Sequence, residues 1–70
     1  NIMNKNLLIV GAGAYGVVVS DIAHEMGCFD KIDFIDDENE STPTGEKVIG
    51  KIKNLAELNC EYSNIIVAID

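Results

Sequence analysis

Apolar residues in this sequence are arranged in two ways, as short runs and as a helical repeat. Runs at residues 7–10, 31–36 and 65–69 have the length and composition of β-strands. The first and the last are apolar at every position, which is typical of strands buried on both faces of a parallel sheet. We therefore expect three strands, with the third fully buried.

A helix is predicted between the first two strands, over residues 14–26. Its apolar positions have the i, i+3, i+4, i+7 spacing of a single buried face: Val18, Val19, Ile22, Ala23 and Met26. The polar residues on or near the opposite side are Ser20, Asp21, His24 and Glu25. Gly27 stands where a C-terminal cap is expected. Because three consecutive valines disfavour an isolated helix, packing against the sheet must stabilise it.

The second half of the chain is more polar. Residues 38–46 contain Pro43 and Gly45 and have the composition of a surface loop. Residues 47–52 are expected to form a short extended piece or a turn. A brief second helix, with Asn54 as its N-cap, is indicated by three apolar residues, Leu55, Ala56 and Leu58.

The order strand–helix–strand–loop–helix–strand implies a parallel sheet with right-handed crossovers. If the third strand pairs on the far side of the first, the helices cover opposite faces and the strand order is 2-1-3. Ligands bind outside the carboxyl ends of the strands where the chain reverses direction in this way. The expected fold class is α/β, a small Rossmann-like three-layer domain with a short parallel sheet of about three strands.

A glycine motif lies at that reversal point. The first strand leads directly into Gly11-Ala12-Gly13-Ala14-Tyr15-Gly16, which reads G-x-G-x-x-G and precedes the predicted helix. Such glycines permit a tight turn, the close approach of a phosphate and close helix–strand packing. Asp36 follows Gly16 by 20 residues, where an acid would accept hydrogen bonds from a ribose hydroxyl. These features predict a nucleotide site; the alternative is a turn that serves packing alone, beside solvated acids at Asp36 and Asp37.

Charge and length narrow the class of ligand. The 70 residues carry a net charge of −7, five scattered lysines and no arginine, which argues against non-specific nucleic-acid binding. Any phosphate must then be held mainly by backbone N–H groups. About three strands suit half of a dinucleotide site, such as a nucleoside diphosphate that carries a sugar, although a longer parent protein could supply the other half.

The remaining candidate groups have simpler interpretations. Cys28 and Cys60 are expected to be small buried hydrophobic residues in a reducing cytosol, and Met26 a core residue. His24 has no partner at a telling spacing, so we expect a surface residue near the carboxyl end of the helix. The acidic run at residues 36–40 is expected to be a solvated loop and not a metal site.

The termini bear on localisation and domain organisation. No signal peptide and no apolar run long enough to span a membrane is present, so we expect a cytoplasmic protein without a membrane partner. The sequence stops at Asp70, directly after the third apolar run. We interpret residues 1–70 as one domain, the N-terminal domain of a longer protein.

Several stretches form a joint pattern that is more specific than the glycine motif alone. They are residues 8–16, Asp21-Ile22-Ala23 with Gly27, Phe34-Ile35-Asp36-Asp37, Val48-Ile49-Gly50 and Val67-Ala68-Ile69. This pattern resembles the N-terminal, PglD-like domain of bacterial sugar acetyltransferases. Those enzymes act in pilin glycosylation, bacillosamine synthesis and sialic-acid O-acetylation, and the resemblance covers residues 5–70.

The resemblance implies that the domain holds the UDP part of an amino-sugar nucleotide. It assigns diphosphate contacts to the loop from Gly11 to Gly16, uridine contacts to Asp36 and Asp37, and the lining of the pocket to Ala68 and Ile69. It also implies a C-terminal left-handed β-helix that binds acetyl-CoA, forms trimers and supplies a histidine as general base. These 70 residues contain no hexapeptide repeat of that kind. We therefore expect no catalytic residue and no cofactor here, and acetyl-CoA and a homotrimer for the parent protein.

Two positions depart from the family pattern. Tyr15 stands where members often have histidine, and Asp70 where glycine is common. Because of these departures, the family pattern does not identify which sugar the nucleotide carries. The leading expectation is the UDP-sugar-binding domain of an acetyl-CoA-dependent sugar N- or O-acetyltransferase of surface-glycan biosynthesis. The alternatives are a NAD-binding module of an oxidoreductase or regulator, with Asp36 contacting an adenosine ribose, and a structural domain that binds no nucleotide.

Overall fold

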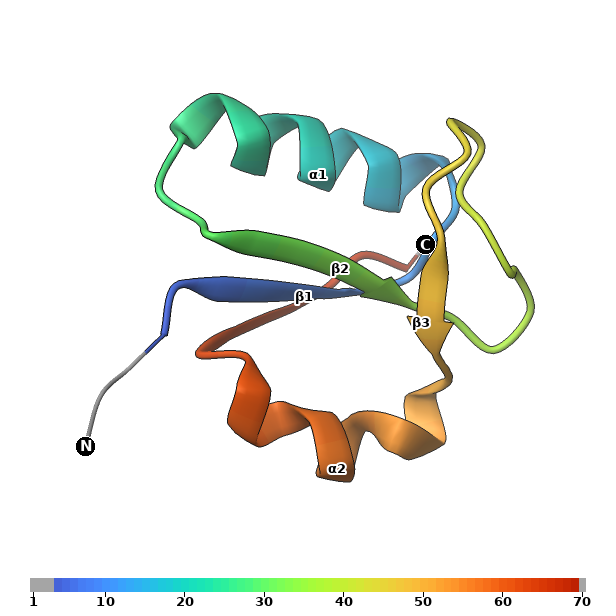
Figure 1. Cartoon of the computed structure of the whole chain (residues 1–70). Coiled ribbons are helices and arrows are strands. Elements are labelled where there is room, and N and C mark those ends of the chain that lie inside the picture. The colour runs from blue at the N-terminus through green and yellow to red at the C-terminus, as the bar shows by residue number, and fades with distance from the viewer. Residues whose placement is uncertain (1–3, 70) are drawn as a thin grey trace.

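The structure, a computed structural model, describes residues 4–69 and has three layers (Figure 1). Helix α1 covers one face of a central sheet, and a shorter helical segment around α2 covers the other. The elements are β1 (Asn6–Val10), α1 (Ala14–Met26), β2 (Lys31–Ile35), β3 (Val48–Gly50), α2 (Leu55–Leu58) and β4 (Asn64–Val67). Single 3₁₀ turns, η1 (Ile52–Asn54) and η2 (Asn59–Glu61), flank α2.

The sheet has four strands in the order β3-β2-β1-β4, and all pairs are parallel. The predicted parallel α/β class is confirmed, whereas about three strands in the order 2-1-3 was wrong. The additional strand, β3, extends the sheet beyond β2 within the segment predicted as a short extended piece or turn. Its three residues are too few for an alternating pattern, and its register with β2 shifts between Phe34 and Ile35. Its place is fixed by long-range contacts, including the hydrogen bond from Asp36 N to Gly50 O at 3.0 Å.

Alternate residues of β1 face the two sides of the sheet and build two hydrophobic clusters. Leu7 and Ile9 belong to the cluster on the α1 side, with Phe34 and Ala23. Leu8 and Val10 belong to the cluster on the α2 side, which is completed by Ile35 and Tyr62, with Leu55 and Leu58 packed against it. This division confirms that β1 is buried on both faces, as expected for a central parallel strand.

Helix α1 has the predicted bounds, but the face that it buries is shifted from the predicted one. Its buried residues are Gly16, Ser20 and Ala23, whereas Val18, Ile22 and Met26 are 51%, 57% and 63% exposed. Small residues at this i, i+4, i+7 spacing let the helix axis approach the sheet closely, which turns the larger side chains toward the flank. The predicted face is therefore confirmed only in part: Ala23 is buried and Val19 packs against the core, whereas burial of Val18 and Ile22 and the core position of Met26 were wrong. Ser20, expected on the polar side, is buried, and its Oγ has no hydrogen-bond partner among residues 4–69.

The carboxyl end of α1 agrees with the sequence. Gly27 adopts a left-handed conformation with φ of 66°, and its N–H donates to the His24 carbonyl at 3.2 Å. His24 is exposed in the last turn, as predicted. A positive charge on the imidazole would interact favourably with the helix dipole there.

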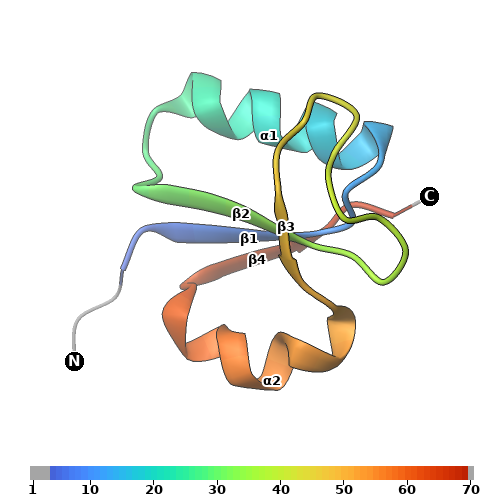
Figure 2. The same ribbon diagram turned by 45° about the vertical axis from the view of Figure 1, so that its right-hand side comes forward.

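The last strand was expected to be fully buried, and this was wrong. All four residues of β4 are exposed because, within residues 4–69, β4 forms one edge of the sheet (Figure 2). Its β1-facing side is paired from Asn64 to Val67, and its other side is not. An apolar run indicates a strand but cannot show whether a neighbour covers it.

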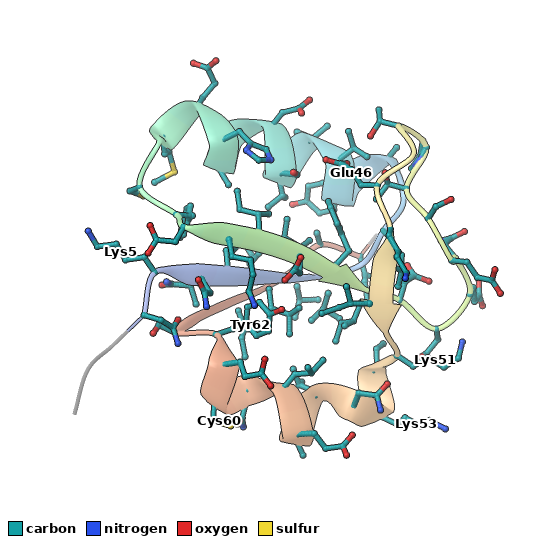
Figure 3. All side chains as sticks on the ribbon, viewed as in Figure 1. Lys5, Glu46, Lys51, Lys53, Cys60 and Tyr62 are labelled. Atoms are coloured by element: carbon teal, nitrogen blue, oxygen red, sulfur yellow. The ribbon has the colours of Figure 1, made fainter. Side chains whose placement is uncertain are left out.

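Both cysteines differ from the sequence-based expectation. Cys28 and Cys60 are exposed free thiols in the described part of the chain, not buried hydrophobic residues. Figure 3 shows Cys60 on the outer side of the layer that contains α2. Asn54 precedes α2, but its side chain does not cap that helix; its Oδ1 accepts the Lys51 N–H instead, at 2.8 Å. Within residues 4–69, no helix has the length and apolar character needed to cross a membrane.

Candidate nucleotide-binding site

The glycine loop passes from the end of β1 to the start of α1 along the carboxyl edge of the sheet. Gly11 has φ of 124°, a conformation that residues with a side chain rarely adopt, and an added Cβ would overlap the Ala68 carbonyl. Its N–H donates to Ile35 O at 2.9 Å, so the loop is tied to β2 at its first residue. A Cβ on Gly16 would in turn overlap the Gly11 carbonyl. Two of the three glycines are therefore required by packing of the protein against itself.

Gly13 has a different environment. A Cβ added there would meet no atom of the described residues within 4 Å. Gly13 is the N-cap residue of α1, and its carbonyl accepts the Val17 N–H at 3.1 Å, the first hydrogen bond of the helix. The N–H groups of the first helical turn have no acceptor within the helix, and glycine has no side chain to cap them. Open space, free donors and the positive end of the helix dipole therefore coincide at Gly13.

Asp36, at the end of β2, is bound by backbone N–H groups. Its Oδ2 accepts the Ala12 N–H at 2.8 Å, and its Oδ1 accepts those of Glu38 at 2.7 Å and Asn39 at 2.9 Å. These bonds, that from Ala12 above all, lower the pKa of the Asp36 carboxyl to about 2, against the opposing effect of partial burial. Asp36 is therefore a carboxylate at neutral pH, and it joins the glycine loop to the β2–β3 connection.

Asp37 joins the same edge to the layer that contains α2, which is the lower layer in Figure 1. Its Oδ1 accepts the Ile52 N–H at 2.9 Å, and its carbonyl accepts the Lys51 ammonium at 3.0 Å. Figure 3 shows Lys51 at the end of the lower layer that lies nearest β3. The sequence did not indicate Lys51 as part of this site, because its proximity to Asp37 depends on the position of β3. It brings a positive charge next to an edge rich in carboxylates.

Two adjoining depressions lie along this edge. One, of about 170 Å³, is lined by Gly11, Gly13, Ala14, Tyr15, Asp36, Asn39, Ala68 and Ile69. The other, of about 280 Å³, is lined by Gly11, Asp36, Asp37, Glu38, Ile52 and Ile69. They share three residues, Gly11, Asp36 and Ile69, so together they form one continuous surface.

The structure therefore brings together most of the residues that the sequence indicated. Eight of the ten line the two depressions, while Ala12 and Gly16 are buried behind them. Tyr15 is half exposed at the start of α1. Sequence analysis missed Glu38 and Asn39, which lie in the irregular segment after β2, and Ile52, which begins the 3₁₀ turn η1; none belongs to a recognisable motif. Asp70, where the family pattern has glycine, lies outside the described residues.

A metal ion needs several ligating side chains close together. Among residues 4–69, no three histidine, cysteine, aspartate or glutamate side chains are grouped so that they could hold a metal ion. Asp36 and Asp37 direct carboxylate oxygens at backbone N–H groups.

Comparison with protein families gives a match over nearly the whole chain. A family described as the PglD N-terminal domain matches residues 6–70. The chain belongs to this family. It is a PglD-like N-terminal domain of the sugar acetyltransferases, and the resemblance inferred from the sequence is confirmed.

Solved structures agree with this assignment. The acetyltransferase domain of PglB from Neisseria gonorrhoeae FA1090, in complex with acetyl coenzyme A, is 36% identical with a TM-score of 0.81. The match covers 94% of this chain and 32% of that one. A second structure of that domain is also 36% identical, with a TM-score of 0.82, and the match covers 94% of this chain and 33% of that one. No curated protein sequence matches the chain. The domain thus spans about a third of the length of the solved chains it matches.

Proposed function

We propose that this domain binds the nucleotide part of a UDP-amino-sugar for an acetyl-CoA-dependent sugar N- or O-acetyltransferase. The observation that carries the proposal is Gly13. Its Cα faces open space at the start of α1, beside the depression of about 170 Å³. A phosphate there would lie next to uncapped N–H groups at the positive end of a 13-residue helix.

The shape of the site supports a ligand with a diphosphate in its middle. In this proposal the glycine loop holds the diphosphate. The uridine lies in the depression bordered by Asp37 and Ile52, with Asp36 at the boundary between the two regions. Ala68 and Ile69, after β4, lie against the first residue of the loop, Gly11, and Ile69 borders both depressions.

Acetyl transfer is assigned to the remainder of such an acetyltransferase. The sequence has a single histidine, His24, which is exposed in the last turn of α1. The glycine loop lies at the other end of that helix, so His24 is remote from the proposed substrate. Acetyl-CoA, which the related gonococcal domain binds in its solved complex, is accordingly proposed as the acetyl donor of the whole enzyme, and a homotrimer as its assembly. Pilin or another surface glycan is proposed as the product pathway, with the enzyme in the cytoplasm.

Calorimetry with UDP, a UDP-N-acetyl-amino-sugar and NAD tests the proposal. Binding of both uridine ligands at one site, with at least equal affinity for the UDP-sugar and no response to NAD, is the expected result. If NAD binds and UDP does not, the dinucleotide-binding alternative is correct. If none of the three binds, the glycine turn serves packing alone.

A further inference from the structure

The hydrogen bonds between β1 and β2 continue past the end of the two strands. The β1 and β2 residues pair in register from Asn6 with Lys31 to Val10 with Ile35. One step further, Gly11 N–H donates to the Ile35 carbonyl at 2.9 Å. The next N–H, that of Ala12, donates to a side chain, Asp36 Oδ2, at 2.8 Å. A carboxylate therefore accepts the Ala12 N–H at the point where the chain leaves β1 and enters the glycine loop.

This bond connects residues 24 positions apart and is the tie between the middle of the glycine loop and the β2–β3 connection. Ala12 is 1% exposed, so its N–H would lose a partner that water cannot readily replace if the carboxylate were removed. The other oxygen of Asp36 is engaged with Glu38 and Asn39, which fixes the carboxylate from the opposite side. The carboxylate is thus held on both sides and sets the position of Ala12.

We propose that Asp36 is a positioning residue of this site: it holds Ala12 so that the adjacent N–H groups at the start of α1 remain directed at the ligand phosphates. This inference rests on the proposed function for the identity of the ligand. It gives Asp36 a role that acts through the loop and not through the nucleoside. Asp36 therefore matters for every ligand that carries the diphosphate, with or without a uridine.

Two substitutions distinguish the bond from Asp36 to Ala12 from the bonds that Asp36 makes within its own turn, to Glu38 and Asn39. Asp36→Ser leaves a short oxygen that can accept the Glu38 or Asn39 N–H, two and three residues away, as in an ST-turn, but it is too short to reach Ala12. Glu40→Ser is the matched control, because it removes the same charge from an exposed position of the same loop. Loss of a carboxylate beside an anion site would by Coulomb's law strengthen anion binding in both variants. A weaker affinity in Asp36→Ser alone would therefore have the opposite sign to the charge effect.

The experiment is a titration of each variant with UDP and with inorganic pyrophosphate, followed by amide resonances at neutral pH. We expect Asp36→Ser to weaken both ligands by a similar factor, about tenfold, the loss typical of one charge-assisted hydrogen bond. Glu40→Ser should bind both at least as well as the unmodified protein. Hydrogen exchange at Ala12 should accelerate in Asp36→Ser without ligand, and should be unchanged in Glu40→Ser.

The outcomes separate the two proposals. A weaker affinity for UDP with unchanged affinity for pyrophosphate would show that Asp36 contacts the nucleoside, and would overturn the positioning role. Unchanged affinity for both ligands and unchanged exchange at Ala12 would overturn it as well. If the unmodified protein binds no UDP, the proposed function fails, while exchange at Ala12 still reports whether Asp36 fixes the loop. If Asp36→Ser does not fold, Asp36→Asn replaces it: its single acceptor oxygen can face Ala12 or the N–H groups of Glu38 and Asn39 but not both, so affinity for both ligands should fall together if hydrogen exchange at Ala12 accelerates, and unchanged affinity despite faster exchange would overturn the positioning role.

Discussion

The three glycines of the loop meet different physical demands, although they occupy one motif. Gly11 and Gly16 are required because a Cβ on either would overlap backbone of the protein itself. Gly13 has no such neighbour among residues 4–69 within 4 Å. Packing among the described residues therefore does not require glycine at this position, and the missing side chain leaves room at the start of α1 for the proposed phosphate. This difference means that substitutions at Gly13 and at Gly11 should have separable effects on ligand binding and on folding.

Gly13→Val should remove ligand binding with little effect on folding. The valine side chain would occupy the space proposed for the phosphate, and the only folding cost is that of a β-branched N-cap, about 1 kcal/mol. Gly11→Ala is the contrasting variant, because a Cβ there is both strained and overlapping, and it should destabilise the fold by about 2–3 kcal/mol. Urea denaturation and UDP titration measure the two effects. Normal UDP affinity in Gly13→Val would contradict the phosphate position.

The sequence predicted where the site residues lie better than what they contact. Asp36 was placed at the carboxyl end of a strand, and it is there. Its bond to Ala12 depends on the register between β1 and β2, and no local pattern encodes that register. Lys51 was missed for the same reason, since its ammonium reaches Asp37 only through the return of the chain along β3.

At the scale of elements, α1 shows which signals are reliable. Its bounds follow from the glycine loop before it and the C-cap glycine after it, and both signals are local. Its buried face is set by how closely the helix can approach the sheet. Gly16, Ser20 and Ala23 permit that approach, whereas hydrophobicity alone had favoured Val18 and Ile22. Side-chain volume, and not only polarity, therefore selected the face.

A small polar cluster fastens the lower layer to the sheet. Tyr62, which follows η2 and lies between the sheet and the layer that contains α2 (Figure 3), donates a hydrogen bond from its hydroxyl to Asp33 on β2. Lys31 Nζ lies 4.0 Å from Asp33 Oδ2 and 5.1 Å from the centre of the Tyr62 ring. Burial, and then the bond to Asp33, raise the pKa of Tyr62 well above its usual range, so the hydroxyl keeps its proton and remains a donor.

Tyr62→Phe should destabilise the domain by about 1.5–2 kcal/mol, because it removes a hydrogen bond to a charged group at a buried position. Tyr15→Phe is the matched control, since it deletes the same hydroxyl from a half-exposed residue. Its unfolding free energy should stay within about 0.5 kcal/mol of the unmodified protein. Urea denaturation measures both. Equal stability of the two variants would show that the bond to Asp33 contributes nothing to attachment of the lower layer.

At the scale of the whole molecule, the apolar surface is unevenly distributed. The flank formed by β4 and α1 contains Ile66 beside Ile22 and Met26, while Ile65 and Val67 project from the opposite face of β4; all five are more than 40% exposed. Between the helix and the strand lies an apolar depression of about 210 Å³. The strand residues from Asn64 to Val67 include no charge and no proline, the features that usually keep an edge strand from pairing.

This edge should make the 70-residue chain self-associate as its concentration rises, through pairing at β4, because that strand has unpaired backbone groups and apolar side chains. Ile66→Lys places a charge in the middle of the edge and should shift the association midpoint to at least about tenfold higher concentration, a change of about 1.4 kcal/mol. Ile49→Lys is the matched control, because Ile49 is 43% exposed and Ile66 42%, but Ile49 lies on β3 at the opposite edge. Sedimentation velocity over a concentration series measures the midpoint. An equal shift in both variants would mean that added positive charge, and not the β4 edge, governs association. A sedimentation coefficient of the unmodified chain that does not change with concentration would show that repulsion from the net charge of −7 outweighs attraction between the exposed apolar flanks.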